Sequence, residues 1–239
     1  MFAILKREIN SFFSTPVGFL VVALFLIVNN LILWFIPGEF NVFDNGLADL
    51  SSFFIVTPWV FLILIPAITM KAFSEEKNIG TFELLATKPI SLKDIVLGKY
   101  LGAVSLICLS LTPTILYHIT ISNLLESSSI WDIGNMIGSY IGLFFLILAF
   151  ASIGIFASTI SKSQVVTFIS SVIICFLVFY GFEIVSYFVQ ISSFEINTLG
   201  MKSHFDTISR GVIDTRDLIY FSSVSVFFLI LTIINLRKD

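Results

Sequence analysis

Six long apolar segments with few charges divide this sequence of 239 residues. A helix needs about 20 residues to cross the roughly 30 Å of hydrocarbon in a bilayer. Because lipid offers no partners to backbone N–H and C=O groups, each segment is predicted to be a helix that satisfies its own backbone. The sequence therefore predicts an all-α, polytopic membrane protein with six transmembrane helices, at about residues 17–36, 53–70, 100–121, 134–158, 165–186 and 217–235.

These segments leave little chain for a separate soluble domain. Hydrophobic residues make up 57% of the sequence, and its mean hydropathy is +1.02. A soluble domain of ordinary size would need most of the remaining residues in one piece. We therefore expect residues 1–239 to form a single transmembrane domain surrounded by the lipid bilayer.

Basic residues gather on one side of the predicted helices. If the N-terminus lies in the cytoplasm, ten of the 13 Lys and Arg residues are cytoplasmic, and only Lys202, Arg210 and Arg216 lie outside. Cytoplasmic loops of membrane proteins carry such an excess of basic residues. The pattern predicts that both termini are cytoplasmic.

The residues before the first predicted span have the pattern of an amphipathic helix. Phe2, Leu5, Ile9 and Phe12 recur at helical spacing opposite a polar face, and Pro16 separates them from the span. A helix of this kind rests with its apolar face in the membrane interface. We expect an N-terminal interfacial helix on the cytoplasmic side.

Residues 71–99, between spans two and three, carry nine charged side chains. Residues 73–86 have the pattern of a short amphipathic helix that is broken at Gly80 and restarts at Thr81. Pro89 ends it, because proline lacks an N–H and restricts the residue before it. A short helix with one polar and one apolar face can rest at the membrane surface or dock into a groove on another protein. A solvated loop is the alternative interpretation of the same composition.

Gly134, Gly138 and Gly142 open span four with two overlapping G-x-x-x-G units. Small residues at every fourth position let another helix approach closely. This face is predicted to pack against a helix, either within the chain or in a second copy.

Two ionisable residues lie within predicted spans. Glu183 is in span five, where it would reach water if it lies near the outer end, or need a partner and mark a functional path if it lies deeper. His118 lies near the outer end of span three, where it would relay protons or bond a neighbouring carbonyl group.

The segment between spans five and six is predicted to contain a re-entrant or surface helix. Phe205, Ile208, Val212 and Ile213 have helical spacing, which indicates an apolar face with the charges turned outward. Two of the polar residues, four positions apart, are predicted to form an ion pair, Arg210 with Asp214. The candidate polar residues of this segment are His204, Asp206, Arg210, Asp214 and Arg216.

Several motifs of catalysis are missing from the sequence. It contains no G-x-x-x-x-G-K-[ST] phosphate loop, no H-E-x-x-H, no G-x-S-x-G, and no cluster of His and Cys suited to a metal. We therefore expect a chain that is not an enzyme, with no metal, no cofactor of its own and no nucleic-acid partner.

The charged segment resembles the cytoplasmic-loop signature of ABC transporter permeases of the type-2 exporter class. That signature has two acids, basic residues, Gly-Thr, an acid, Leu-Leu and a proline. Asn78 departs from it where a second basic residue is common. The N-terminal KREINSFFSTP and the later HFDTISRGVIDTRDLIYF also look like this class. The residues that match the signature are Glu75, Glu76, Lys77, Gly80, Thr81, Glu83, Leu84, Leu85 and Pro89.

The resemblance implies a coupling helix that docks on a separate ATPase subunit, which would bind ATP and Mg. It also implies that the N-terminal helix is a connecting helix, that the chain pairs with a second permease copy or a related membrane subunit, and that the membrane is the bacterial cytoplasmic (inner) one. Within the class, the whole chain looks most like gliding-motility permease subunits of Bacteroidota. In the coupling helix we expect Glu83 to make an electrostatic contact, Gly80 and Thr81 to form the turn, and an apolar contact from Phe82, Leu84 and Leu85.

Two other functions remain open at this point. A stand-alone secondary transporter, driven by ions or protons, would need several charges within the membrane. Only Glu183 and His118 are candidates for them. A structural membrane anchor of a motility or secretion complex would use ATP for assembly, and the sequence does not separate it from a transporter.

Overall fold

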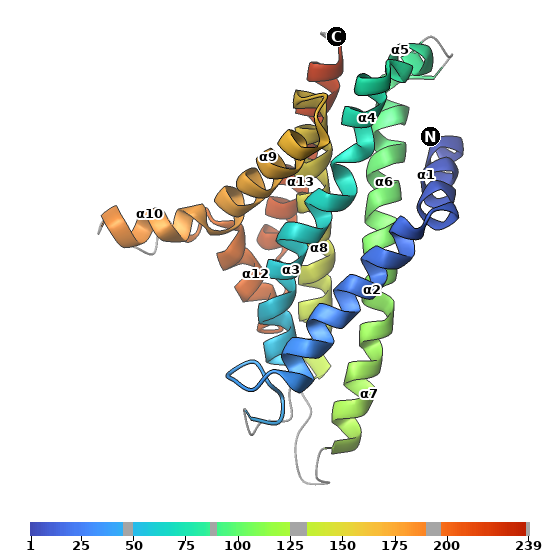
Figure 1. Ribbon diagram of the computed structural model, residues 1–239. Helices are drawn as coiled ribbons and strands as arrows, with labels where there is room; N and C mark the ends of the chain where they lie inside the picture. The colour runs from blue at the N-terminus through green and yellow to red at the C-terminus, as the bar shows by residue number, and fades with distance from the viewer. Residues whose placement is uncertain (45–49, 87–89, 125–132, 190–196, 238–239) are drawn as a thin grey trace.

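The computed structural model describes residues 1–44, 50–86, 90–124, 133–189 and 197–237, and these residues form helices without strands. Figure 1 shows a tall bundle with both ends of the chain near its upper end. The helices in chain order are α1 (Phe2–Ser14), α2 (Pro16–Asn30), η1 (Leu31–Phe35), α3 (Ser51–Thr69), α4 (Lys71–Ile79), α5 (Thr81–Ala86), α6 (Leu92–Leu111), η2 (Thr112–Thr114), α7 (Ile115–Leu124), α8 (Ile133–Ile160), α9 (Gln164–Phe176), η3 (Leu177–Gly181), α10 (Phe182–Val189), α12 (Met201–Ser209) and α13 (Thr215–Leu236).

Six helical stretches are long and apolar enough to cross a membrane, and each overlaps one predicted span. The second and third are longer than predicted, because hydropathy marks only the apolar part of a helix and each of these helices continues through charged residues. The stretches are Pro16–Phe35, Ser51–Ile79, Leu92–Ser122, Gly134–Ile160, Gln164–Phe188 and Thr215–Leu236.

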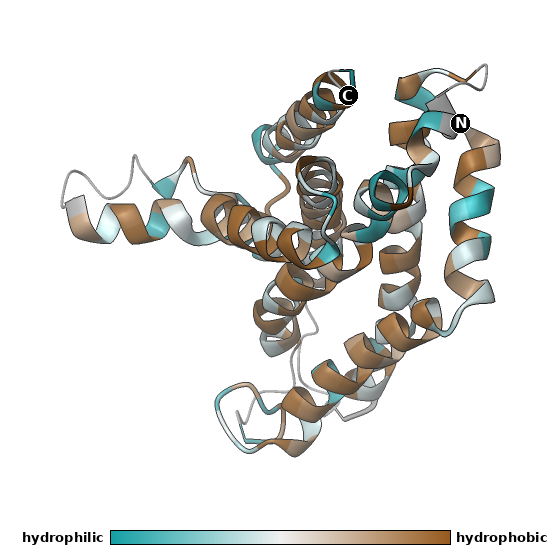
Figure 2. Ribbon diagram, turned by 45° about the horizontal axis from the view of Figure 1, so that its top comes forward, coloured by the Kyte–Doolittle hydropathy of each residue, from teal (hydrophilic) through white to brown (hydrophobic). Residues whose placement is uncertain are grey.

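Helix α8 is the centre of the bundle. It packs against α3, α6, α9, α12 and α13, and Leu143, Ile147 and Phe150 on it are fully buried. A helix that is apolar on all sides is stable only when it is surrounded by protein or lipid. Figure 2 shows hydrophobic residues over most of the bundle, and hydrophilic residues in α1, in α4 and near the C-terminus.

The predicted N-terminal helix is present as α1, and it lies beside α6 (Figure 1). Thr15 is extended and Pro16 begins α2, so the chain turns between the two helices. The face of α1 that packs on α6 carries Ile4, whereas Phe2 of the predicted apolar face is exposed. The location of α1 in the membrane interface stays a prediction.

The helix predicted between spans five and six is α12, and it is shorter than the apolar spacing suggests. Phe205 and Ile208 are buried, but Val212 and Ile213 are exposed and lie beyond the end of α12. Gly211 turns the chain there with φ +83°, a conformation in which a side chain is strained. The apolar spacing therefore overestimated the length of the helix.

The predicted ion pair between Arg210 and Asp214 is wrong. Residues four apart meet only on a continuous helix, and α12 ends at Ser209. Asp214 instead caps α13, where its Oδ1 accepts a hydrogen bond of 2.9 Å from the backbone N–H of Arg216. Both residues remain on the surface of this segment.

Gly138 and Gly142 pack against α12 within the same chain. A Cβ atom at Gly138 would lie 2.6 Å from the carbonyl oxygen of Ile208, and one at Gly142 would lie 3.3 Å from side-chain atoms of Ile208 and Phe205. Gly134 contributes backbone beside Gly211, its carbonyl carbon being 3.3 Å from where a Cβ at Gly211 would lie. Of the two alternatives for this glycine face, the structure supports packing within the chain.

Candidate functional site

The charged segment after span two folds as two short helices joined at Gly80. α4 continues closely from α3, and α5 begins at Thr81. Gly80 has φ +78° and ends α4, its N–H donating to the carbonyl of Glu76. The predicted break at Gly80 and restart at Thr81 are confirmed, and we call this unit the α4–α5 elbow.

Two aromatic rings hold the elbow together. Phe73 on α4 and Phe82 on α5 are both buried, and their rings pack edge to face with centroids 6.0 Å apart. Phe82 was expected to offer an apolar contact to a partner, yet its ring faces inward. Exposed positions of the elbow include Ile79, at 66% exposure, Thr81 and Glu83. The side chains of Leu84 and Leu85, and all of Pro89, lie outside the described residues.

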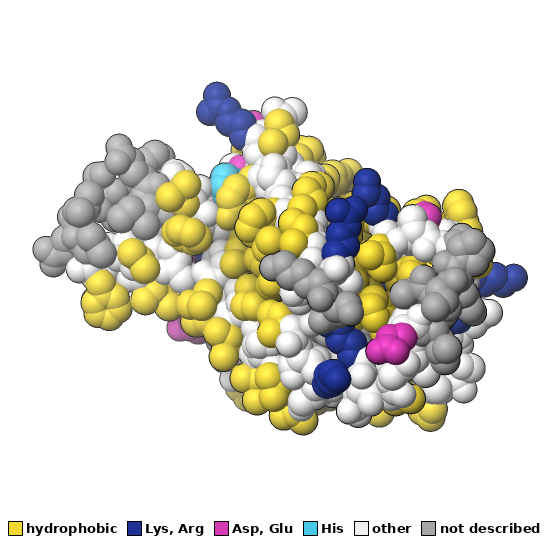
Figure 3. All heavy atoms as spheres, turned by 90° about the horizontal axis from the view of Figure 1, so that it is seen from above, with side chains coloured by type: hydrophobic (Ala, Val, Ile, Leu, Met, Phe, Trp, Pro, Cys, Tyr) yellow, Lys and Arg dark blue, Asp and Glu magenta, His cyan; other side chains and the backbone are white. Residues whose placement is uncertain are grey.

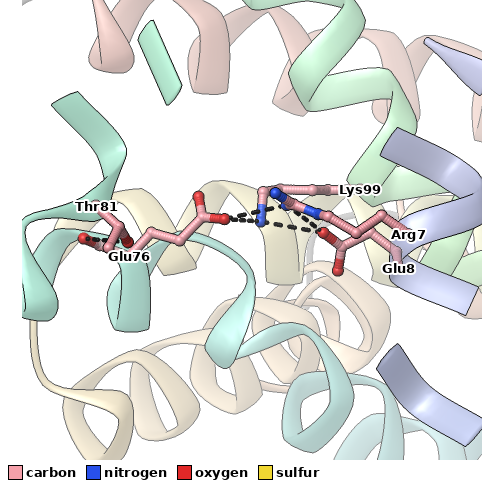
Figure 4. Close-up of polar contacts among 5 residues, drawn as sticks. All are labelled: Arg7, Glu8, Glu76, Thr81 and Lys99. Carbon is pink, nitrogen blue, oxygen red and sulfur yellow. Dashed lines mark hydrogen bonds and ion pairs between the residues drawn. The ribbon is translucent and has the colours of Figure 1, made fainter. Parts of the chain in front are cut away.

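Four charged side chains from three helices meet beside the elbow, and we call them the charge cluster (Figure 4). Lys99 on α6 donates from Nζ to Oε1 of Glu76 on α4 at 2.8 Å, and lies 3.4 Å from Oε1 of Glu8 on α1. Arg7 on α1 donates to the same two carboxylates, at 2.7 Å to Glu8 and 3.2 Å to Glu76. Two cations and two anions thus alternate across α1, α4 and α6.

The electrostatics of the cluster depend on the burial of Lys99, whose side chain is 4% exposed. Removing an ammonium group from water costs several kcal/mol unless counter-charges and hydrogen bonds offset it. Glu8 and Glu76 provide them, and Nζ also lies 5.2 Å from the ring centroid of Phe73. Burial alone would lower the pKa of Arg7, but its hydrogen bonds and charge interactions with Glu8 and Glu76 raise that pKa overall. The alternating charges therefore hold the four side chains together.

Two glycines of α6 bring α1 close enough to complete the cluster. A Cβ at Gly98 would lie 2.8 Å from side-chain atoms of Ile4, and a Cβ at Gly102 would lie 2.8 Å from Cβ of Glu8. Small residues four apart let two helices approach closely. The contact therefore places Glu8 beside Lys99.

On its other side, α4 is tied to the ends of α8 and α13. Nζ of Lys77 donates to the carbonyl oxygen of Thr159 at 2.6 Å, and the amide of Asn235 donates to the same oxygen at 3.2 Å and to Oγ1 of Thr159 at 3.0 Å. Helix α4 is thus linked by polar contacts to α1 and α6 on one side and to α8 on the other, where Thr159 also binds α13.

A cavity of about 680 Å³ lies next to the cluster, between α1, α3, α4 and α6. Its charged lining has both signs, so it does not select a ligand of one charge. Of the predicted residues, Glu75, Glu76 and Thr81 border it. Among the described residues, no group of three His, Cys, Asp or Glu side chains is placed to hold a metal ion.

The other predicted polar residues lie away from the elbow. Glu183 on α10 is bound through both carboxylate oxygens to Nζ of Lys202 on α12, at 2.8 and 3.0 Å. His204 hydrogen-bonds through Nδ1 to Oδ1 of Asp217 at 2.6 Å and stacks on Tyr220. His118 is half-buried on α7. Glu183 is therefore paired with Lys202, as a carboxylate deep in the membrane would have to be. His118 does not take part in this ion pair.

Sequence reasoning missed Arg7, Glu8 and Lys99. Lys99 was read as the last charge of a polar loop, but α6 begins at Leu92 and carries it into the bundle. The signal that could have marked it is its position between Gly98 and Gly102, which open the way to a neighbouring helix. Nothing in the sequence pairs it with residues of α1.

Comparison with known proteins supplies the family. A model of the family described as ABC-2 family transporter protein matches residues 42–235, which is most of the chain. No curated protein sequence matches it. Glu76 and Lys99 of the cluster lie within the matched region, and Arg7 and Glu8 precede it. The chain belongs to the ABC-2 transporter family, as a multi-pass permease subunit that has no ATPase activity of its own and works with an ATPase partner.

Proposed function

We propose that this chain is the permease of an ABC exporter whose ATPase subunit docks on the α4–α5 elbow, with the charge cluster passing the ATPase's movement to α1 and α6. The observation that carries the proposal is the cluster itself: three helices are joined by alternating charges around the buried Lys99, at the base of the elbow. Glu83 and Ile79 are its exposed contact residues, and Phe82 has the role of holding α5 in place.

A rigid joint of this kind suits transmission of movement. Coupling needs an element with two arrangements that a partner can bias. The elbow is stiffened by the Phe73–Phe82 contact, and α4 has polar contacts on both sides. Displacement of the elbow by a docked ATPase would pull on α1 through Arg7 and on α6 through Lys99.

In this proposal the elbow and both termini face the cytoplasm of a bacterial cell. The end of the bundle that carries them displays several Lys and Arg side chains (Figure 3), which supports the assignment through the excess of basic residues on cytoplasmic surfaces. A second permease copy or a related subunit would pack on α9, η3 and α10. These helices lean out of the bundle (Figure 1) and expose Ile173 and Leu177.

Two narrower roles rest on the sequence resemblance. One is gliding motility, in which ATP hydrolysis would serve a surface machine rather than export. The other is a re-entrant function for α12 near the exit. The packing of α12 against α8 and α13 supports the second role.

The experiment tests docking with a charge reversal at an exposed position. Glu83→Lys is expected to remove at least about nine-tenths of the ATPase that copurifies with the permease, because it opposes the proposed contact without touching the core. Glu39→Lys is the matched control, since Glu39 is also exposed and lies in the connection between spans one and two. ATPase retained equally by both variants would remove Glu83 from the docking site, and no ATPase with the unmodified permease would overturn the proposal.

A further inference from the structure

A second cavity, of about 410 Å³, lies between α3, α8, η3 and α12. It is separate from the cavity beside the charge cluster and shares no lining residue with it. Its size is within the range of small-molecule sites, about 300–1,000 Å³. Such a site has an apolar wall and a few polar groups that orient the ligand.

One wall of this cavity is aromatic and reaches the exposed surface of the bundle. Phe54 and Phe179 are buried in it, whereas Trp59 is 40% exposed and Ile55 is 54% exposed. Trp59 packs edge to face on Phe179 with ring centroids 6.1 Å apart, which fixes this wall. Ile55 and Trp59 lie on a helix long and apolar enough to span the membrane. The cavity is therefore open to an acyl or similar apolar chain from the bilayer.

The opposite wall is charged, and its charges are unequally satisfied. Lys202 is held by both oxygens of Glu183, at 2.8 and 3.0 Å, and lies 3.8 Å from Asp206. Arg210, one turn further along, forms no ion pair among the described residues, although Asp206 lies on the same side of α12 and both border the cavity. The wall thus presents to a ligand the guanidinium of Arg210, and the carboxylate of Asp206, whose 3.8 Å contact with Lys202 is the weaker of that lysine's two ion pairs.

We propose that this cavity binds an amphipathic zwitterion, whose head carries a phosphate or carboxylate beside a primary ammonium and whose apolar chain lies on Phe54 and Trp59. The guanidinium of Arg210 would bind the anionic group through paired N–H donors. The ammonium would lie against Asp206. Without the ligand ammonium, Asp206 would share the single ammonium of Lys202, 3.8 Å away, with Glu183.

The state of Asp206 agrees with this assignment. Burial raises the pKa of its carboxyl group, and the nearby Glu183 adds to the rise, while Lys202 and Arg210 counteract it. A ligand ammonium would relieve this penalty, because an opposite charge favours the ionised carboxylate. The volume holds a head group and the beginning of a chain, and the remainder would lie in lipid.

Binding at this cavity needs no ATPase, so the proposal is independent of the docking function proposed above. The experiment measures lipid retained by the purified full-length permease in detergent, by native mass spectrometry. Equal amounts of phosphatidylethanolamine, whose head is zwitterionic with a primary amine, and phosphatidylglycerol, whose head is anionic, are added. The variants are Arg210→Gln and Asp206→Asn, and Arg216→Gln is the control, because Arg216 is exposed on the same segment but does not border the cavity.

Phosphatidylethanolamine is expected in excess on the unmodified protein and on Arg216→Gln. Arg210→Gln should reduce its binding about tenfold, the effect of one charge-assisted contact. Asp206→Asn should remove the preference for phosphatidylethanolamine over phosphatidylglycerol. Equal binding of both lipids to the unmodified protein, or an Arg210→Gln variant no different from the control, would overturn the proposal.

A soluble source of the same chemistry is distinguished in a second arm with glycerophosphoethanolamine, which has the head group and no chains. If the apolar wall takes part, this compound should compete with the lipid only at concentrations at least about a hundredfold higher, because it loses the burial of several CH₂ groups. Competition at equal concentration would contradict the lipid assignment.

Discussion

Replacement of Lys99 by methionine tests the charge cluster directly. Methionine keeps a flexible apolar stem of similar length against Phe73 and removes only the ammonium group. Glu8 and Glu76 then face each other with Arg7 as their remaining cation, at 2.7 and 3.2 Å. We expect the variant to insert into the membrane but to be markedly less stable.

The size of the loss follows from the burial of the three side chains. Removing one partner of a buried ion pair costs about 3–5 kcal/mol. The exposed fractions are 4% for Lys99 and 17% and 19% for Glu8 and Glu76, so water and Arg7 partly replace the lost ammonium. The low end of that range, about 3 kcal/mol, is therefore expected. For a chain of this length it corresponds to a fall in Tm of about 6–12 °C.

The assay is thermal unfolding of the purified permease in one detergent, monitored by intrinsic fluorescence. Lys93→Met is the matched control, since Lys93 is an exposed lysine on the same helix. The triple variant Lys99→Met, Glu8→Gln, Glu76→Gln should recover most of the loss, because neutralising every partner leaves no buried charge uncompensated.

Two results would refute this reasoning. A fall in Tm for Lys99→Met no larger than that for Lys93→Met would show that the ammonium is not held by the cluster. Strict additivity of Lys99→Met and Glu76→Gln would show that the two groups do not interact, since contacting residues give coupling energies of about 0.5–3 kcal/mol.

Two further predictions concern contacts between helices. Gly102→Val should push α1 away from α6, since a Cβ at this position would lie 2.8 Å from Cβ of Glu8. We expect the free energy of unfolding to fall by about 1–3 kcal/mol and a disulfide crosslink engineered between α1 and α6 to be lost. Retention of that crosslink would contradict the expected displacement. His204→Leu should lower the free energy of unfolding by about 1–3 kcal/mol, because it leaves the buried Asp217 without the hydrogen-bond partner that lies 2.6 Å away. Thermal unfolding measures this loss, with His118→Leu as the comparison. Equal Tm values for the His204→Leu variant and the unmodified protein would exclude a stabilising pair.

Local patterns predicted those elements whose cause is local. The break at Gly80 follows from the freedom of glycine to end a helix in the left-handed conformation. The glycine face of α8 follows from spacing alone. The predicted length of the helix at α12 failed, because the turn at Gly211 outweighed an apolar spacing that continued past it.

Contacts between distant residues were beyond the reach of the sequence. Phe82 has the same apolar character whether its ring faces a partner or Phe73, and only the bend at Gly80 decides which. Likewise, the sequence does not tell whether the carboxylate of Glu183 lines a channel or forms an ion pair. The position of α12, which brings Lys202 to it, decides for the ion pair.

The sequence by itself determined that this chain has six helices long and apolar enough to cross a membrane, because hydropathy and the need to satisfy the backbone in lipid act on each segment separately. Only the tertiary structure decided where the charges meet. Lys99 is 23 positions from Glu76 and 91 from Glu8, and the close approach at Gly98 and Gly102 brings them together. Burial then makes the contact strong, since a charge removed from water must find its counter-charge within the protein.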